Sequence, residues 1–241
     1  MRMKRFKIYI ATHKLFTPPK DRLYKVVKGG SALHEIPQYK SDAKGKNISR
    51  KNPNYCELTV LYWMWKNAKQ NILGLCHYRR YFSLNGTDPI TLKEVKELFR
   101  SYNLVVPIPF DFGTTTVEEN YALCHAIEDY QKCRELIYKH YPEYSAAFEE
   151  VSQSTSMYYC NMLVTTKELL NDYCSWLFPL LEYLESEIDL ESYDDYNKRV
   201  FGFLSERLLP VWVVKNKAKL KIKELPLLMT EETTELTTTQ F

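Results

Sequence analysis

The stretch that most constrains the fold is GLCHYRRYF, residues 74–82. A short apolar run from Ile72 to Cys76 predicts a buried strand, which leads directly into His77, Arg79 and Arg80. Adjacent arginines are costly to bury unless an anion meets them. In open α/β sheets, ligands bind beyond the carboxyl ends of the strands. Our hypothesis is that this strand end holds the phosphates of a nucleotide sugar.

Predicted strands alternate with predicted helices along most of the chain. Apolar runs predict strands at 7–11, 72–76, 104–107 and 157–165. Helical spacing predicts helices at 52–67, 91–102, 116–141, 143–152, 167–188 and 194–209. This alternation indicates an α/β fold with a mostly parallel central sheet flanked by helices. We expect a single domain over 1–225 and a polar, flexible tail over 226–241.

Local signals refine these elements. Asn52-Pro53 predicts a helix start, and Thr91 and Thr116 each open a capping box. The helix after Thr116 is expected to place His125 and Asp129, four residues apart, on one face. Asn161 lies in the middle of a predicted strand, where its amide needs partners.

Composition excludes several classes of protein. A formal net charge of +3 is too small to indicate nucleic-acid binding. The six cysteines include no CxxC pair, and the start of the chain shows no secretory signal, so we expect reduced thiols and a cytoplasmic protein. No apolar run is long enough to span a bilayer. Dinucleotide, Walker, GxSxG and HExxH motifs are all absent.

Four runs of the sequence resemble a known bacterial family. They are NISRKNPNYCELTVLYWMWKN (47–67), GLCHYRRYF (74–82), YCNMLV (159–164) and FGFLSERL (201–208). The family comes from capsule, exopolysaccharide and O-antigen gene clusters. It was formerly a domain of unknown function and was later identified as galactofuranosyltransferases. The resemblance implies a small GT-A-like glycosyltransferase fold and UDP-galactofuranose as the donor.

The resemblance also makes the cations after Cys76 informative. Metal-dependent GT-A enzymes carry an Asp-x-Asp pair after a central strand, where a divalent cation holds the diphosphate. Here the similar position holds His77, Arg79 and Arg80. A guanidinium can meet the charge of the leaving diphosphate directly. We therefore expect metal-independent catalysis, with no cofactor besides the donor substrate. The alternative is that one arginine pairs with a carboxylate such as Asp129 or Glu206 within the core.

An inverting transfer needs a carboxylate that deprotonates the acceptor hydroxyl. The position of FGFLSERL resembles that of the base in many GT-A enzymes, so Glu206 is the first candidate and Asp129 the second. Asp195 and Glu57 are further candidates. Glu206 has the alternative of a salt bridge with Arg199 or Arg207 on the same helix.

The remaining candidates are assigned to the donor and the acceptor. Thr12 and His13 end the first strand, where uridine would lie in such a fold. The polar residues expected to close the nucleotide-sugar pocket are Asp42, Asn47, Ser49, Asn54 and Glu57. Glu57 has the alternative of favouring the helix dipole. The candidates for sugar or acceptor contact are His125, Asn161 and Arg207. The alternative for His125 is a histidine packed in the core, and the alternative for Asn161 is a hydrogen bond to the sheet.

The expected function is an inverting transfer of galactofuranose to a lipid-linked or oligosaccharide acceptor in surface polysaccharide synthesis. The basic run 215–223 suggests peripheral contact with the inner face of the cell membrane, although a solvated strand face also explains it. Two alternatives remain open: a glycosyltransferase that uses another UDP-hexose, and a non-catalytic subunit that binds nucleotides or glycans.

Overall fold

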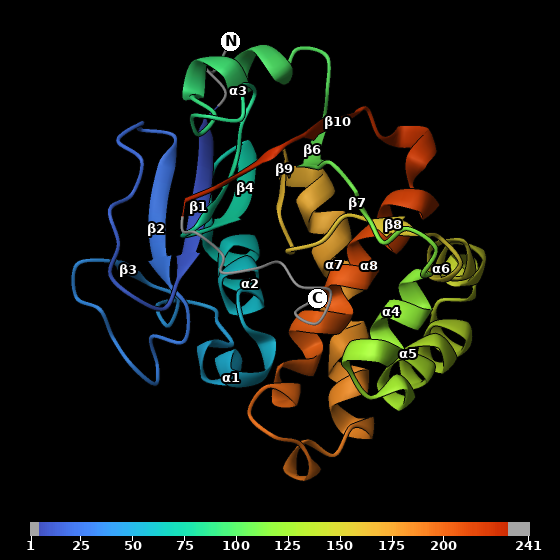
Figure 1. Ribbon diagram of the computed structural model, residues 1–241. Helices are drawn as coiled ribbons and strands as arrows, with labels where there is room; N and C mark the ends of the chain where they lie inside the picture. Colours follow the sequence, from blue (N-terminus) through green and yellow to red (C-terminus); the bar gives the residue numbers. More distant parts are fainter. Residues whose placement is uncertain (1–4, 231–241) are drawn as a thin grey trace.

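The computed structural model describes residues 5–230, and Figure 1 shows its sheet beside a group of helices. The strands are β1 (Phe6–Thr12), β2 (Tyr24–Lys28), β3 (Lys40–Ser41), β4 (Ile72–His77), β5 (Arg80–Phe82), β6 (Leu104–Pro107), β7 (Phe110–Asp111), β8 (Ser156–Met157), β9 (Leu163–Thr166), β10 (Ile222–Leu225) and β11 (Leu227–Met229). The helices are α1 (Asn52–Tyr55), α2 (Leu58–Asn67), α3 (Leu92–Leu98), α4 (Val117–Cys124), α5 (Ile127–His140), α6 (Ser145–Ser152), α7 (Lys167–Glu187) and α8 (Val200–Lys215).

The central sheet has the strand order β10-β6-β9-β4-β1-β2-β3; off this path, β5 pairs with β4 and β11 pairs with β5. The pairs β1–β2, β1–β4, β2–β3 and β6–β10 are parallel, whereas β9 runs antiparallel between β4 and β6. The expectation of an α/β fold with a mostly parallel sheet flanked by helices is therefore confirmed.

Alternating side chains of the strands fill a separate core on each face of the sheet. In β1, Tyr9 and Ala11 join the larger core, which includes buried residues of α2, α7 and α8. Ile8 and Ile10 point to the opposite face and join the core that includes Val95 of α3. Both faces are covered by helices, as a parallel sheet requires.

Gly74 lets the central strands pack closely. A Cβ at this position would lie 2.8 Å from a methyl group of Val164 and 2.9 Å from a side-chain carbon of Ile8. These distances are shorter than van der Waals contact, so any larger residue here would push β4 away from its neighbours.

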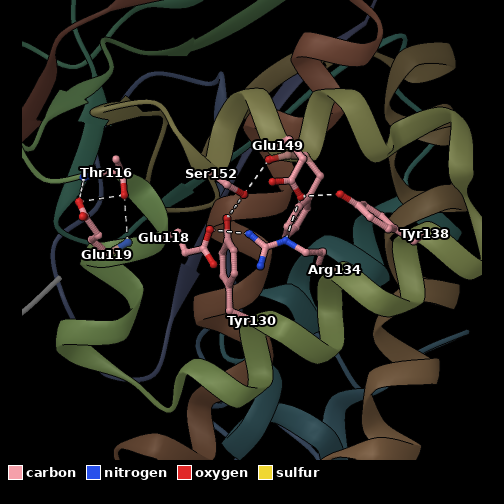
Figure 2. Close-up of polar contacts among 9 residues, drawn as sticks. Thr116, Glu118, Glu119, Tyr130, Arg134, Tyr138, Glu149 and Ser152 are labelled. Carbon is pink, nitrogen blue, oxygen red and sulfur yellow. Dashed lines mark hydrogen bonds and ion pairs between the residues drawn. The ribbon is translucent and has the colours of Figure 1, made fainter.

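The helices α4, α5 and α6 form a group at one side of the molecule (Figure 1). The predicted capping boxes at Thr91 and Thr116 are both present. Figure 2 shows how Arg134 of α5 joins this group, because its guanidinium pairs with Glu118 of α4 and with Glu149 of α6. Tyr130 and Ser152 share a hydrogen bond of 2.8 Å beside it.

Two of the expected helices are interrupted. The helix expected over 52–67 breaks at Cys56, whose φ of 49° cannot continue a right-handed helix. The helix expected after Thr116 ends at Cys124, and His125 is its extended C-cap. His125 and Asp129 therefore do not share a helix face, which corrects that expectation.

The end of the chain also differs from expectation. α8 continues through Pro210 to Lys215, because residues 210–213 are buried and hold the helix in the core. Within the segment expected to be a tail, Leu227–Met229 forms β11 and pairs with β5. Residues 231–241 of that segment lie outside the described residues. Over 5–230, no helix has both the length and the apolar character needed to cross a membrane.

Candidate functional site

The candidate site lies where the parallel strands β1 and β4 end side by side. Ala11 pairs with His77 in the sheet, and the Tyr78 N–H donates to the Ala11 carbonyl oxygen at 3.1 Å. A cavity of about 400 Å³ opens at these strand ends. Its walls bring together the predicted residues Thr12, His13, Glu57, His77, Arg79, Arg80 and Glu206.

Three arginines from two distant segments line this cavity. Arg79 and Arg80 follow β4, and Arg199 ends the short 3-10 helix Asn197–Arg199 that leads into α8. The buried Nε of Arg80 has no hydrogen-bond partner within residues 5–230. A buried unsatisfied guanidinium nitrogen is costly, so this donor is available to an anionic ligand.

The histidines of the cavity are not further cations. Burial, assisted by the Arg80 charge, lowers the pKa of His77 to about 3. Burial and the nearby Lys14 also lower the pKa of His13. Both imidazoles are therefore neutral near pH 7, and positive charge in the cavity comes from the arginines.

Two glutamates face these cations. Glu57 precedes α2, and its Oε1 accepts a hydrogen bond of 2.6 Å from Asn161 Nδ2. Glu206 lies in α8, where its Oε1 accepts from the Cys160 N–H at 3.1 Å and its Oε2 lies 3.2 Å from an Arg207 nitrogen. Burial raises the pKa of both carboxyl groups, which is typical of groups that exchange protons in a reaction.

Asn161 supports the cavity from behind its wall. It was expected inside a strand, but Cys160 and Asn161 have φ values of 75° and 49° and form a left-handed turn between β8 and β9. The Asn161 side chain is buried, and it bonds to Glu57, to Ser205 and to the Gly202 carbonyl oxygen. It is not among the residues that line the cavity.

The polar residues of the 42–49 loop hold the loop itself. Asp42 is buried and accepts from the N–H groups of Gly30 and Ser31 at 2.9 Å each. Ser49 donates to Asp42 and accepts from the Ala32 N–H. Asn47 bonds to backbone groups of its own turn. These three residues lie outside the cavity wall, so they are not placed to contact a ligand there.

Five other candidates also lie outside the cavity wall. Asn54 donates to the Lys198 carbonyl oxygen, and the Tyr193 hydroxyl donates to the Asp129 carboxylate, with both carboxylate oxygens 2.9 Å from it. His125 stacks on Phe203 with a centroid distance of 4.0 Å. Arg207 is 2% exposed, and it bonds to Glu206, Asn120 and the Phe203 carbonyl oxygen. The side chain of Asp195 is fully exposed and is not part of the wall.

Arg199 and Cys56 are residues of the cavity that the sequence analysis did not select. Arg199 Nε donates to the Cys56 Sγ at 3.3 Å. Gly202 follows one turn later in the wall, and a Cβ there would lie 3.2 Å from the same sulfur. The recurrence of Arg199, Gly202 and Glu206 at helical spacing was the signal that could have placed all three on one face.

A second, wider depression of about 760 Å³ shares only the wall residue Tyr78 with the first. It contains Phe16, Asp21 and Glu94 but none of the residues predicted for the site. In the described part of the chain, no group of three or more His, Cys, Asp or Glu side chains is arranged to hold a metal ion.

The fold is that of a glycosyltransferase. The apo structure of the WbbM bifunctional glycosyltransferase matches this chain with a TM-score of 0.87 and 29% sequence identity, over 95% of this chain and 46% of that chain. This chain therefore spans about half the length of the WbbM structure. Its residues 7–217 match the sequence profile of a family described as a domain of unknown function, DUF4422, and the chain belongs to that family.

The other comparisons are more distant. The mannosyltransferase Ktr4p from S. cerevisiae, in complex with GDP, matches with a TM-score of 0.42 and 13% identity, over 93% of this chain and 62% of that chain. No curated protein matches the sequence.

Proposed function

We propose that this protein is a glycosyltransferase that moves galactofuranose from UDP-galactofuranose to a glycan acceptor in capsule, exopolysaccharide or O-antigen synthesis. The observation that carries the proposal is the meeting of Arg79, Arg80 and Arg199 with Glu57 and Glu206 in one cavity at the ends of β1 and β4. Arginines suit a diphosphate, and carboxylates suit sugar hydroxyls. The glycosyltransferase fold supports the same reaction class.

The donor diphosphate would lie against Arg79 and Arg80, with Arg199 facing it from α8. As the glycosidic bond breaks, negative charge grows on the leaving UDP, and guanidinium groups stabilise it. At about 4 Å and an effective dielectric near 20, one such contact is worth about 4 kcal/mol before desolvation. Neutral His77 supplies a hydrogen-bonding group beside them, since its buried Nε2 has no partner within the described chain.

The nucleoside would lie at the end of β1, beside Thr12 and His13. Thr12 is buried, and its hydroxyl donates to the Lys14 carbonyl oxygen at 2.7 Å, which fixes the loop after the strand. A ligand group at this point is within reach of the backbone that follows β1, as nucleotides are in other open α/β sheets.

Glu206 is the proposed base. Its carboxylate would take the proton of the acceptor hydroxyl while the acceptor oxygen attacks the anomeric carbon. The bond from that carbon to the diphosphate breaks, UDP leaves with the electron pair, and the anomeric configuration inverts. The contacts of Glu206 with Arg207 and with the Cys160 N–H favour its ionised form, which a base requires.

Incubation with UDP-galactofuranose and an oligosaccharide acceptor tests this function. We expect transfer of galactofuranose with release of UDP, and much slower transfer from UDP-galactopyranose. A faster pyranose reaction would assign the enzyme to another UDP-hexose. UDP binding without transfer or hydrolysis of any UDP-hexose would instead define a non-catalytic binding subunit.

A further inference from the structure

Three non-glycine residues in the described chain have positive φ angles, and all of them lie at or directly behind the candidate site. Cys56, with φ of 49°, lines the cavity and immediately precedes Glu57. Cys160 and Asn161, with φ of 75° and 49°, form the turn before β9. Non-glycine residues adopt this conformation at a cost in free energy, and such residues concentrate where a site needs a fixed geometry.

The turn at Cys160 and Asn161 provides a donor to each of the two glutamates. The Cys160 N–H donates to Glu206 Oε1 at 3.1 Å, and Asn161 Nδ2 donates to Glu57 Oε1 at 2.6 Å. The donors come from adjacent residues, whereas the acceptors are far apart in the sequence. The turn therefore fixes the positions of both carboxyl groups relative to each other.

The orientation of the Asn161 amide is itself determined by its surroundings. The Ser205 hydroxyl donates to Asn161 Oδ1 at 2.9 Å, which leaves Nδ2 to face Glu57 and the Gly202 carbonyl oxygen. The residue is 2% exposed and is not part of the cavity wall. It acts on the carboxylates and not on a ligand.

We propose that Asn161 is a positioning residue, whose left-handed turn aligns Glu57 with Glu206 for the transfer reaction. This inference rests on the proposed function, and it replaces the expectation that Asn161 contacts the sugar or the acceptor. The hydrogen bond to one oxygen of Glu57 orients its carboxylate toward the cavity and favours its charged form.

Other groups around Glu57 also influence its ionisation. The surrounding charged and titratable groups are Arg80, Arg199, Glu206, Cys56, Cys160 and Tyr173. Arg80 and Arg199 favour the carboxylate, and Glu206 disfavours it. None of these groups is replaced by a substitution at Asn161. The Asn161→Gly variant therefore reports the loss of the amide alone, whereas Asn161→Asp also adds a negative charge beside Glu57.

The test uses two variants of the full chain. Asn161→Asp keeps the size of the side chain and replaces the donor to Glu57 with a carboxylate. Asn161→Gly fits the left-handed backbone and removes the amide. In both we expect kcat to fall about 100-fold with a small change in the KM for the UDP-sugar, because the reacting groups are misplaced while the diphosphate contacts stay. The acid limb of the pH profile should move to higher pH, since Glu57 becomes harder to ionise and the proposed alignment needs its carboxylate charged beside the base Glu206.

Asn103→Ala is the matched control. Asn103 also links segments distant in the sequence, through the Lys219 carbonyl oxygen and the Lys221 N–H, but it lies outside the cavity wall. We expect it to lower the melting temperature without moving the pH profile. A shifted profile in this control would mean that loss of stability alone explains the Asn161 variants, and would overturn the proposal.

A spectroscopic measurement separates this inference from the proposed function. NMR of protein labelled with ¹³C in its glutamate carboxyls, assigned with Glu57→Gln, follows the titration of Glu57 without any substrate. A higher titration midpoint in Asn161→Gly, which adds no charge, supports the positioning role, even if the wild-type protein transfers no sugar and the proposed function fails. An unchanged Glu57 titration in folded variants overturns the role, whatever the activity.

Discussion

Glu206 and Arg207 are neighbours in the sequence and still form an ion pair of 3.2 Å. Adjacent residues of a helix do not normally face each other. Here the guanidinium is 2% exposed, and it is held by Asn120 and by the Phe203 carbonyl oxygen, so it lies beside its neighbour's carboxylate. Arg207 therefore belongs to the support of Glu206, and it is not placed to contact an acceptor.

The role of Glu206 as base predicts a large effect of Glu206→Gln. The amide keeps the shape of the side chain but cannot take a proton, so kcat should fall about 100- to 10,000-fold. Binding of UDP, measured by calorimetry, should remain close to that of the wild type. Turnover at the wild-type rate would remove Glu206 from this role and leave Glu57 as the carboxylate to test.

The arginine contacts predict weaker donor binding in Arg79→Ala and Arg80→Ala. Loss of one charge-assisted hydrogen bond costs roughly 1.5–3 kcal/mol, which corresponds to roughly 10- to 100-fold weaker binding of UDP. Arg100→Ala is the control, because its side chain is 75% exposed and pairs with Glu97 on α3. Equal affinities in all three variants would place the diphosphate elsewhere.

The buried carboxyl of Glu57 predicts a stability that depends on pH. Burial raises its folded-state pKa above the ordinary value of 4.5, so the folded state holds the proton more tightly than the unfolded state does. The stability that comes from the protonated group is fully present below the ordinary, unfolded-state pKa. It is lost as pH rises through the raised folded-state pKa. Glu57→Gln cannot ionise and should not show this loss.

Urea unfolding measures this difference at two values of pH. One is about pH 4.5, near the ordinary pKa of a glutamate, and the other is about pH 7.5, well above it. We expect the advantage of Glu57→Gln over the wild type to grow with pH. An advantage that is constant or that shrinks over this range contradicts the raised pKa. Glu97→Gln on α3 is a suitable control, because its side chain is 67% exposed.

A substitution of Arg134, which Figure 2 shows between Glu118 and Glu149, should lower the stability of the protein and leave the reaction unchanged. Arg134→Met would remove the partner of Glu118 and Glu149, which join α4 and α6 to α5. We expect about 2 kcal/mol of destabilisation and a melting temperature lower by about 4–8 °C. Transfer activity measured well below that temperature should stay at the wild-type level, and a large loss of kcat would show that these helices shape the site.

Features that depend on neighbours in the chain were predictable from the sequence. The apolar residues of β4 and the cations that follow it are adjacent, so strand, strand end and anion site were predicted together. The capping boxes at Thr91 and Thr116 are also local patterns, and both are present. For the same reason the α/β class was predictable from the alternation of short apolar runs with helical spacing.

Features set by contacts between distant segments were not predictable. The breaks at Cys56 and Asn161 depend on backbone angles that α8 and the two glutamates stabilise, and neither residue is a glycine that would have indicated them. Asp42 and Ser49 have the polar character of ligand contacts, but their partners are backbone groups at Gly30, Ser31 and Ala32. A polar residue type alone does not distinguish these two uses.

The central claim is that Arg79 and Arg80 stabilise the diphosphate where related folds use a metal ion. Transfer of labelled galactofuranose from UDP-galactofuranose, measured in excess EDTA and again with added manganese, tests it most directly. We predict that turnover in EDTA equals turnover with manganese. Complete loss of turnover in EDTA, restored by manganese, would contradict the claim.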